Sequence, residues 1–306
     1  MSAFDDHRNL LFTVAYRILG SAADAEDTVQ DTWLKWSSAD RSQVADPRAY
    51  LVRIVTNVAL DRLRSVQARR ETYVGPWLPE PILTSSPEDS AAAESVSVAL
   101  MVLLESLSPL ERAVFVLKEA FAFSYGEIAS AVDRSEETVR QAAHRARGHV
   151  QARRPRFHRS RAQQQAVTTR FLAAAAGGDI NELMEMLAPD VALWTDGGGK
   201  VRQAMRPVVG AAHVATWMAG VSHRAYEGVH PSEMTAELVE INGAPGIVFR
   251  GAGRVIGTLT LVLDPSGRIT TIHNVANPDK LADVTRRSVH PLSPPPASGF
   301  RPVEKR

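Results

Sequence analysis

Two helical modules in a fixed order occupy the first half of this chain of 306 residues. The first, residues 1–70, holds three runs in which apolar residues recur at helical spacing. The second, residues 96–155, contains a segment from 124 to 147 with the form of a helix-turn-helix. A proline-rich linker, residues 71–95, separates the two modules. The chain length and this linker together predict a multidomain protein.

Charge is distributed unevenly along the chain, although the formal net charge is only +1. Residues 24–31 carry four acidic side chains and no basic one. Residues 48–70 carry six Arg against one Asp, and residues 134–161 carry nine Arg against two Glu. Basic patches with acidic flanks are typical of a protein that binds nucleic acid and also contacts another protein. The order of the modules therefore suggests contact with two DNA elements at once.

Composition excludes several other classes of protein. The chain has no cysteine, which excludes disulfides, thiol chemistry and zinc fingers. No apolar run approaches the roughly 18 residues that would span a bilayer. Residues 1–15 do not have the pattern of a signal peptide. We therefore expect a cytoplasmic protein with no membrane contact and no cofactor.

The C-terminal half has a different pattern, in which helical runs are followed by alternating runs typical of strands. Turn signals stand at Asn242-Gly243 and at residues 264–267. This order predicts an α+β domain over residues 160–281, with helices packed on a curved antiparallel sheet. Residues 282–306 hold five prolines and scattered charges, which predicts a flexible tail.

The second helix of the helix-turn-helix has an apolar stripe and a polar face. The stripe is formed by Val139, Ala142, Ala143 and Ala146. Arg and Gln on an exposed helix face can form paired hydrogen bonds with guanine and adenine edges. The alternative, a solvated basic helix that binds nothing, leaves the agreement of turn, cap, stripe and charge unexplained. The residues predicted to read DNA are Arg140, Gln141, His144, Arg145 and Arg147.

Four acidic residues lie close together in the first module, at Asp24, Glu26, Asp27 and Asp31. On a helix their spacing spreads them around more than one face, which is poor geometry for a cage of oxygen ligands. We therefore predict no metal site at these residues. The simplest explanation of the four acidic residues is a helix face exposed to solvent.

This acidic segment resembles a known family. The run Asp24-Ala-Glu-Asp27-Thr-Val-Gln30-Asp-Thr-Trp33 is similar to the second conserved region of sigma-70 family factors. The resemblance implies that the acidic helix docks on the coiled coil of the largest subunit of RNA polymerase. It assigns core-polymerase binding to Asp24, Glu26, Asp27, Gln30, Asp31 and Trp33.

The third helix of the first module, Pro47 to Arg64, also resembles that family. In its extracytoplasmic-function branch, the position of Asn57 lies at a pocket for a base flipped from the minus-ten promoter element. An amide can read a Watson–Crick edge, and Arg62 and Arg64 can hold phosphates of the opened strand. Asp61 is also assigned to the predicted contact with the minus-ten element. Taken alone, Asn57 is better explained as a helix-interior amide bonded to its own backbone.

Residues 1–150 as a whole resemble an extracytoplasmic-function sigma factor, and three further motifs resemble the subgroup with a SnoaL-like extension. The resemblance implies that this extension, a cone of helices on a curved sheet, regulates the sigma factor in cis. It also implies two partners, core RNA polymerase and promoter DNA. The expected regulatory interface consists of the motif residues Trp77, Leu78, Pro79, Glu80 and Pro81; Asp196, Gly197, Gly198, Gly199 and Lys200; and Asn277, Pro278, Asp279, Lys280 and Leu281.

The extension also raises the question of a small molecule, since SnoaL-like cones resemble polyketide cyclases and ketosteroid isomerases. The candidates for a pocket are Trp194, Asp196, His213, Trp217 and His273. A lone His is more often a core residue, and no catalytic Asp can be matched, so we expect no enzyme. Two alternatives stay open: a helix-turn-helix regulator that senses a small ligand, and an isomerase- or cyclase-like enzyme. Neither alternative explains why the first module contains an acidic segment.

Overall fold

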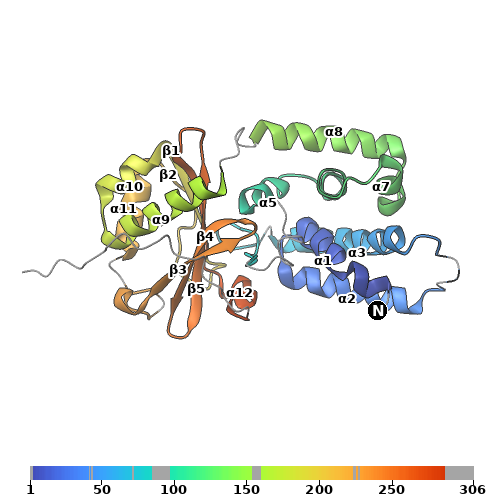
Figure 1. Ribbon diagram of the computed structural model, residues 1–306, viewed down its shortest axis with the longest axis horizontal. Coiled ribbons are helices and arrows are strands. Elements are labelled where there is room, and N and C mark those ends of the chain that lie inside the picture. Colours follow the sequence, from blue (N-terminus) through green and yellow to red (C-terminus); the bar gives the residue numbers. More distant parts are fainter. Residues whose placement is uncertain are drawn as a thin grey trace, which may run out of the picture.

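The two helical modules lie at one end of the molecule and the C-terminal domain lies at the other, with the linker between them (Figure 1). This arrangement confirms the predicted multidomain fold. Among the described residues, no helix combines the length and the apolar character needed to cross a membrane. The computed structural model describes residues 3–40, 42, 44–70, 72–84, 97–153, 160–222, 225–226 and 228–286.

Three helices form the N-terminal module, as the apolar spacing predicts: α1 (Ala3–Leu19), α2 (Ala22–Ser38) and α3 (Pro47–Arg70). Gly20, with φ of +74°, turns the chain between α1 and α2. Ser21 then caps α2, because its hydroxyl accepts a hydrogen bond from the Asp24 N–H at 3.0 Å. Leu11 and Val55 are fully buried where the apolar stripes of the helices meet.

The helix-turn-helix module contains α5 (Val98–Leu104), α6 (Pro109–Phe115), the π-helical turn η2 (Val116–Ala120), α7 (Tyr125–Val132) and α8 (Glu136–Arg153). Ser108 and Ser124 each begin a helix with a capping box, completed by Glu111 and Glu127. Asp133 ends α7 in the left-handed conformation, which a short polar side chain tolerates. The turn between α7 and α8 therefore stands where the sequence predicts it.

The two helical modules share one hydrophobic core. Val52 of α3 belongs to the same cluster of buried residues as Leu117 of η2 and Ile128 of α7. Arg112 of α6 is also buried, and its Nε donates to the carbonyl oxygen of Arg17 on α1 at 2.9 Å. Burial lowers the pKa of Arg112 to about 9. The sequence predicts two modules but does not predict this packing between them.

The C-terminal domain packs helices on a six-stranded sheet with the strand order β2-β1-β6-β5-β4-β3. Adjacent strands are antiparallel except β1 and β6, which run parallel. The predicted α+β fold is confirmed, and the parallel pair is an addition to it. The parallel pair is possible because α11 and the strands β3 to β5 lie between β1 and β6 in the chain, so the last strand can return beside the first in the same direction. The elements are α9 (Arg161–Gly177), α10 (Ile180–Met186), β1 (Leu187–Asp196), β2 (Val208–Val209), α11 (Ala211–Ser222), η3 (Pro231–Glu233), β3 (Thr235–Ile241), β4 (Ala244–Gly251), β5 (Arg254–Leu263), β6 (Ile269–Val275) and η4 (Pro278–Lys280).

Both faces of this sheet are buried. The first face packs against α9, α10 and α11, with Phe171 and Leu193 in the core between them. On the second face, Val275 belongs to a core with Leu78 of the linker and Val98 of α5. Successive strand residues point to opposite faces, so the sheet joins two different cores. The linker and the first helix of the helix-turn-helix module are therefore packed onto the C-terminal domain.

The linker also extends the sheet at the edge formed by β3. Leu83 forms an antiparallel bridge with Ile241, and the Ile82 carbonyl oxygen accepts from the Asn242 N–H at 2.9 Å. An edge strand otherwise presents unpaired backbone groups that favour aggregation. The linker therefore protects this edge as well as connecting the modules.

The flexible tail predicted over residues 282–306 is wrong for its first five residues. Ala282–Arg286 form a short helix, α12, and Val284 is fully buried in the core on the second sheet face. The proline-rich sequence after residue 286 led to the prediction of a flexible tail and gave no indication of this apolar contact. The rest of the predicted tail, 287–306, lies outside the described residues, as do residues 85–95 of the predicted linker.

Candidate regulatory junction and nucleic-acid interface

A fully buried carboxylate at the end of β1 binds the linker. Oδ1 of Asp196 accepts from the Tyr73 hydroxyl at 2.5 Å, and Oδ2 accepts from the Leu78 N–H at 2.8 Å. Nζ of Lys280 lies 2.6 Å from Oδ2 and forms an ion pair with it. A buried charge costs several kcal/mol unless it is paired and hydrogen-bonded. These four residues, with Asn277, are called the junction below.

Lys280 holds the linker backbone at a second point. Its Nζ also donates to the Leu78 carbonyl oxygen at 2.5 Å, so one ion pair binds both backbone groups of that residue. The ammonium lies 3.9 Å from the ring centroid of Trp77 and 4.9 Å from that of Tyr73, which is cation–π geometry. Burial, and then the hydrogen bond to Asp196, raise the pKa of Tyr73 well above its usual value. The hydroxyl therefore remains a donor at physiological pH.

The glycine turn and Asn277 close the junction. Nδ2 of Asn277 donates to the Tyr73 hydroxyl at 2.8 Å. Gly198, with φ of +60°, lies against both groups, and a side chain there would collide with them. Beyond the turn, Lys200 pairs with Asp279 at 2.6 Å. The glycines are therefore required for a close approach of chain segments.

The same linker binds the N-terminal module. The Glu80 carboxylate accepts from the Ala22 N–H at 2.7 Å and so caps α2. Burial raises the pKa of Glu80. Tyr16 of α1 donates to the Glu80 carbonyl oxygen at 2.7 Å and accepts from Nδ2 of Asn242 at 2.7 Å. The linker and the C-terminal domain thus meet α1 together.

The three sequence motifs therefore meet at one place, although their regulatory role stays a prediction. Tyr16, Tyr73 and Asn242 take part without having been predicted. Tyr73 lies outside the three motifs, and the turn Asn242-Gly243 is enough to explain Asn242. The sequence therefore gives no sign that either residue makes a long-range contact. The remaining motif residues lie around the junction, in the turns or in buried positions: Pro79, Pro81, Gly197, Gly199, Pro278 and Leu281.

Three of the four acidic residues of α2 surround one arginine of α3. Nitrogen–oxygen distances from Arg62 are 3.8 Å to Asp24, 3.0 Å to Asp27 and 2.9 Å to Asp31. The four acidic residues occupy more than one face of the helix, as predicted: these three share one side, because steps of three and four residues return to it, and Glu26 does not. Arg62 is consequently engaged within the protein.

The rest of the predicted polymerase-binding surface is open. Glu26 faces away from that cluster and pairs with Arg8 at 2.7 Å, and Gln30 is exposed. Trp33 and Leu34 are 49% and 52% exposed, unusually high for large apolar side chains. The described part of the chain holds no group of three or more residues arranged to bind a metal ion. α2 therefore presents acidic and apolar side chains next to each other.

The predicted minus-ten residues are occupied with internal contacts. Nδ2 of Asn57 donates to the Arg53 carbonyl oxygen at 3.0 Å, the backbone contact expected for a helix-interior amide. Asp61 and Arg64 pair with each other at 2.7 Å on the surface. Contact of these residues with DNA stays a prediction.

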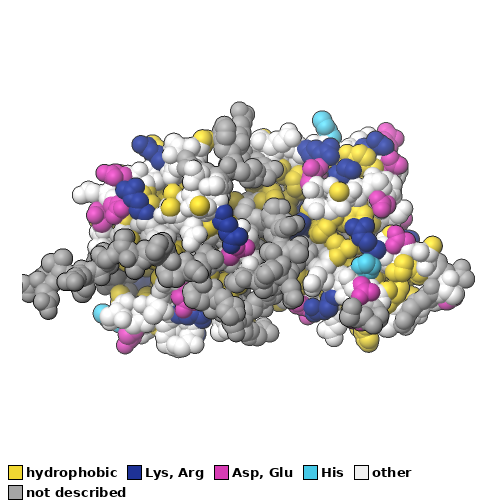
Figure 2. All heavy atoms as spheres, in the orientation of Figure 1, with side chains coloured by type: hydrophobic (Ala, Val, Ile, Leu, Met, Phe, Trp, Pro, Cys, Tyr) yellow, Lys and Arg dark blue, Asp and Glu magenta, His cyan; other side chains and the backbone are white. Residues whose placement is uncertain are grey.

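Helix α8 turns the predicted face outward, with its apolar stripe buried against the module. Gln141 and His144 are exposed on this face. Basic and acidic side chains are interspersed over the helical modules (Figure 2). Exposed ion pairs contribute about 0–1 kcal/mol, so DNA phosphates can replace the carboxylates at little cost. Two of the predicted DNA-reading residues form such pairs, Arg140 with Glu136 and Arg147 with Glu119. Arg145 pairs with Glu111, whose carboxylate is largely buried.

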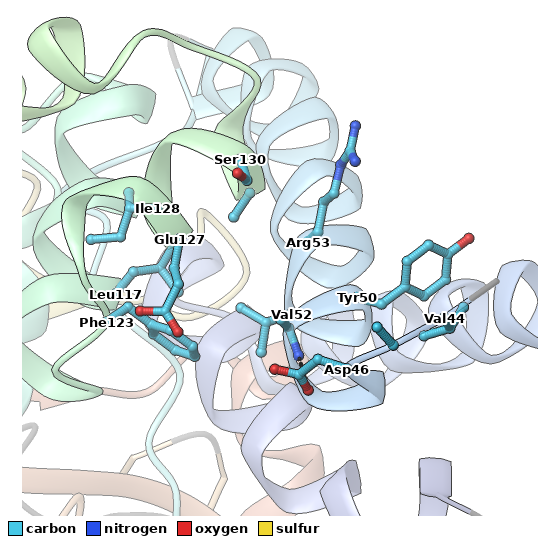
Figure 3. Close-up of a pocket in the computed structure, with 13 residues that line it drawn as sticks. Val44, Asp46, Tyr50, Val52, Arg53, Leu117, Phe123, Glu127, Ile128 and Ser130 are labelled. Carbon is cyan, nitrogen blue, oxygen red and sulfur yellow. Dashed lines mark hydrogen bonds between the residues drawn. The ribbon is translucent and has the colours of Figure 1, made fainter. Parts of the chain in front are cut away.

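The contact between α3 and α7, called the seam below, joins the two helical modules (Figure 3). It contains a cavity of about 300 Å³ between Val52 on one side and Leu117, Phe123 and Ile128 on the other. At its rim the Arg48 guanidinium lies 4.6 Å from the ring centroid of Phe123. The seam holds the two modules against each other.

A second cavity, of about 250 Å³, lies in the C-terminal domain between α9, α11 and the first sheet face. Of the predicted pocket residues only Trp217 lines it. Trp194 and His273 belong to the second face, because strand residues alternate, and Asp196 belongs to the junction. His213 lies elsewhere on α11, with Nδ1 2.9 Å from the Val209 carbonyl oxygen. Burial lowers the pKa of His273 to about 4, so this side chain is neutral.

Comparison with known proteins identifies the helical modules. Residues 3–70 match the family model Sigma-70 region 2, and residues 97–150 match the model Sigma-70, region 4. The chain is 37% identical to the ECF RNA polymerase sigma factor SigJ of Mycobacterium tuberculosis over 292 residues, which is 92% of each chain. The chain belongs to the extracytoplasmic-function sigma factors of RNA polymerase.

Further relatives agree with this assignment. This sigma factor is 30% identical over 285 residues to the probable ECF RNA polymerase sigma factor SigI of Mycobacterium tuberculosis, covering 92% of this chain and 94% of the relative. The crystal structure of Mycobacterium tuberculosis SigJ superposes with a TM-score of 0.73 at 34% identity, covering 92% of this chain and 97% of that one. The comparisons therefore support a sigma factor, and they do not support the ligand-sensing regulator or the isomerase.

The free energy of unfolding should depend much more on the buried ion pair of the junction, Asp196 with Lys280, than on the exposed pair of Lys200 with Asp279. Asp196→Ala should cost about 3–5 kcal/mol of unfolding free energy, because it leaves the Lys280 ammonium buried without its partner. Lys200→Ala removes an exposed pair and should cost less than about 1 kcal/mol. Urea unfolding followed by circular dichroism measures both. Equal, small losses for the two variants would contradict the importance given to the buried pair.

Proposed function

We propose that the C-terminal domain regulates this sigma factor in cis, by holding the two DNA-reading modules together through the linker. The observation that carries this proposal is the double attachment of the linker. Its Leu78 is bound by the ion pair of the C-terminal domain, while its Glu80 caps α2. The C-terminal domain therefore cannot leave the linker without breaking buried contacts.

The described arrangement corresponds to a closed state in this proposal. A sigma factor that reads two promoter elements has to place α3 and α8 on separate stretches of DNA. In the closed state α3 instead packs against α7, and the two modules share a core. Opening exposes the seam but leaves the helices intact, so closed and open states can form a two-state equilibrium. Core polymerase and promoter DNA would then favour the open state.

The domains divide this function as follows. Residues 1–70 bind core polymerase and the minus-ten element, residues 96–155 bind the minus-35 element, and residues 160–281 regulate through the linker, 71–95. Core polymerase contacts Asp24, Glu26, Asp27, Gln30, Asp31 and Trp33. The minus-ten element contacts Asn57, Asp61, Arg62 and Arg64. The minus-35 element contacts Arg140, Gln141, His144, Arg145 and Arg147.

Two observations support these assignments. The exposed Trp33 beside an acidic surface has the composition of a protein contact, in which aromatic side chains provide much of the affinity. Arg140 and Arg147 are paired with carboxylates on the surface, and such ion pairs exchange readily. We also propose that the C-terminal domain accepts a small molecule in its cavity.

Weakening the seam should raise transcription in this proposal. Arg48→Ala removes the contact with Phe123, worth about 0.5–1 kcal/mol at an exposed site, and should raise promoter-dependent transcription about two- to fivefold. Losing a positive charge would by itself weaken DNA binding, so an increase is specific for opening. Run-off transcription with limiting core polymerase measures it, and Arg48→Lys, which keeps the cation, should behave like the wild type. Unchanged or reduced transcription by Arg48→Ala would count against the closed state.

The polymerase-binding surface can be tested with an exposed residue that stabilises nothing else. Trp33→Ala should weaken binding of core polymerase about tenfold or more, as expected for an aromatic anchor of an interface. Met205→Ala, at another highly exposed apolar residue in the C-terminal domain, should bind like the wild type. Surface plasmon resonance with immobilised core enzyme compares them. If the two variants bind equally well, α2 is not the docking surface.

A further inference from the structure

The loop between β1 and β2, together with the adjoining linker, carries a patch that is both apolar and basic. Met205 is 60% exposed, more than any other large apolar side chain of the described residues, and Val74 of the linker is 47% exposed. The two adjoin, because Sδ of Met205 lies 3.9 Å from the place that a Cβ on Gly75 would take. Arg202 and Arg206 are exposed on the same loop. Val74, Arg202, Met205 and Arg206 are called the loop patch below.

The positive charge of the loop patch is not neutralised within the described part of the chain. Lys200 nearby pairs with Asp279, but no described carboxylate pairs with either arginine of the patch. Residues 197–222 contain no acidic side chain. Arg and Met are both enriched where proteins contact one another, whereas contacts with DNA phosphates are made by polar groups. An exposed Met between two arginines therefore favours a protein partner with an acidic and apolar surface.

Helix α2 presents a surface of this complementary kind. Residues seven apart lie on the same side of a helix, so Glu26 lies with Trp33, and Asp27 lies with Leu34. The side chains of Glu26 and Asp27 are 48% and 65% exposed, and the two apolar side chains are exposed beside them. These four residues are called the α2 face below. The ion pairs that the two carboxylates form within the chain lie at the surface, so another partner can replace them at little cost.

We propose that two copies of this chain associate reciprocally, so that the α2 face of each copy contacts the loop patch of the other. The contact removes exposed apolar side chains of both surfaces from water. It also places the carboxylates of Glu26 and Asp27 against the guanidinium groups of Arg202 and Arg206, and such complementary charges fix the orientation of partners. In a two-fold pair each copy uses both surfaces once, so the assembly closes as a dimer and does not grow further.

Pairing has two consequences for the sigma factor. A copy whose α2 face is covered cannot bind core polymerase with it, and this consequence rests on the proposed docking function of α2. The second consequence concerns the linker, because Val74 of the loop patch is the neighbour of Tyr73, which the junction binds. A partner that contacts the linker in this position favours the closed state over any state in which the linker has left the junction. The association itself depends on neither consequence.

Sedimentation of the full-length protein at low salt tests the association. The wild type should form a dimer as its concentration rises, and added salt should weaken the dimer by screening the paired charges. Arg202→Glu with Arg206→Glu should weaken it about tenfold or more, because like charges then face each other. Arg254→Glu with Arg268→Glu reverses two charges elsewhere on the same domain and should associate like the wild type. A wild type that stays monomeric, or a loop variant that associates normally, would overturn the proposal.

An exchange of charges identifies the two surfaces as partners. Glu26→Lys with Asp27→Lys, on α2, should by itself weaken the dimer as much as the loop variant does. A mixture of the α2 variant and the loop variant should associate again, because both contacts of the mixed pair then join opposite charges. One variant carries a fluorescent label so that mixed pairs are seen, and circular dichroism confirms that both are folded. Failure of the folded variants to associate in the mixture would contradict this pairing of surfaces.

Core polymerase and DNA separate this proposal from the others. Dilute, monomeric loop variant should bind core polymerase like the wild type, and core polymerase should dissociate the wild-type dimer. Association that proceeds as described but is unaffected by core polymerase refutes the docking function of α2 and leaves the dimer standing. A loop variant that loses affinity for duplex DNA while its association is unchanged shows that the loop patch contacts DNA, and this result would overturn the dimer.

Discussion

The ion pair between Asp196 and Lys280 is the interaction on which the rest of the arrangement depends. Both side chains are buried, and burial of charge is costly unless every group finds a partner. The partners come from the linker, whose Leu78 contributes both its N–H and its carbonyl oxygen. The linker therefore cannot be replaced by an arbitrary flexible segment. Its backbone satisfies the charges that the C-terminal domain buries.

Fixing the linker at this point has consequences in both directions along the chain. Towards the N-terminus it brings α1 and α2 against the C-terminal domain, through Glu80 and through Tyr16 with Asn242. Towards the C-terminus it covers the edge of β3 and leads to α5, which packs on the same sheet face. The two helical modules are thereby held close enough to share a core. In the proposed regulation in cis, the two modules in contact would have to separate for the sigma factor to read two promoter elements.

Local features of this fold could be predicted from the sequence, because their causes lie within a few residues. The capping box of Ser108, the turn at Asn242 and the buried stripe of α8 are of this kind. The sites are harder, since alternation along a strand shows which strand residues share a face but not which helices cover that face. His273 and Trp217 were therefore assigned to one pocket although they lie on opposite faces. The motifs indicated that linker and C-terminal domain meet, but no local signal could pair Arg62 with its three acidic partners or reveal the seam.

Because the chain has no cysteine, two spin labels can be placed without removing native residues. Ser37→Cys on α2 and His149→Cys on α8 are both exposed positions, one in each helical module. Double electron–electron resonance on the labelled protein measures their separation directly. The account predicts one distance population in the free protein and a clearly longer one in the complex with core polymerase and promoter DNA. The same distance distribution in both samples would contradict a closed state held by the C-terminal domain.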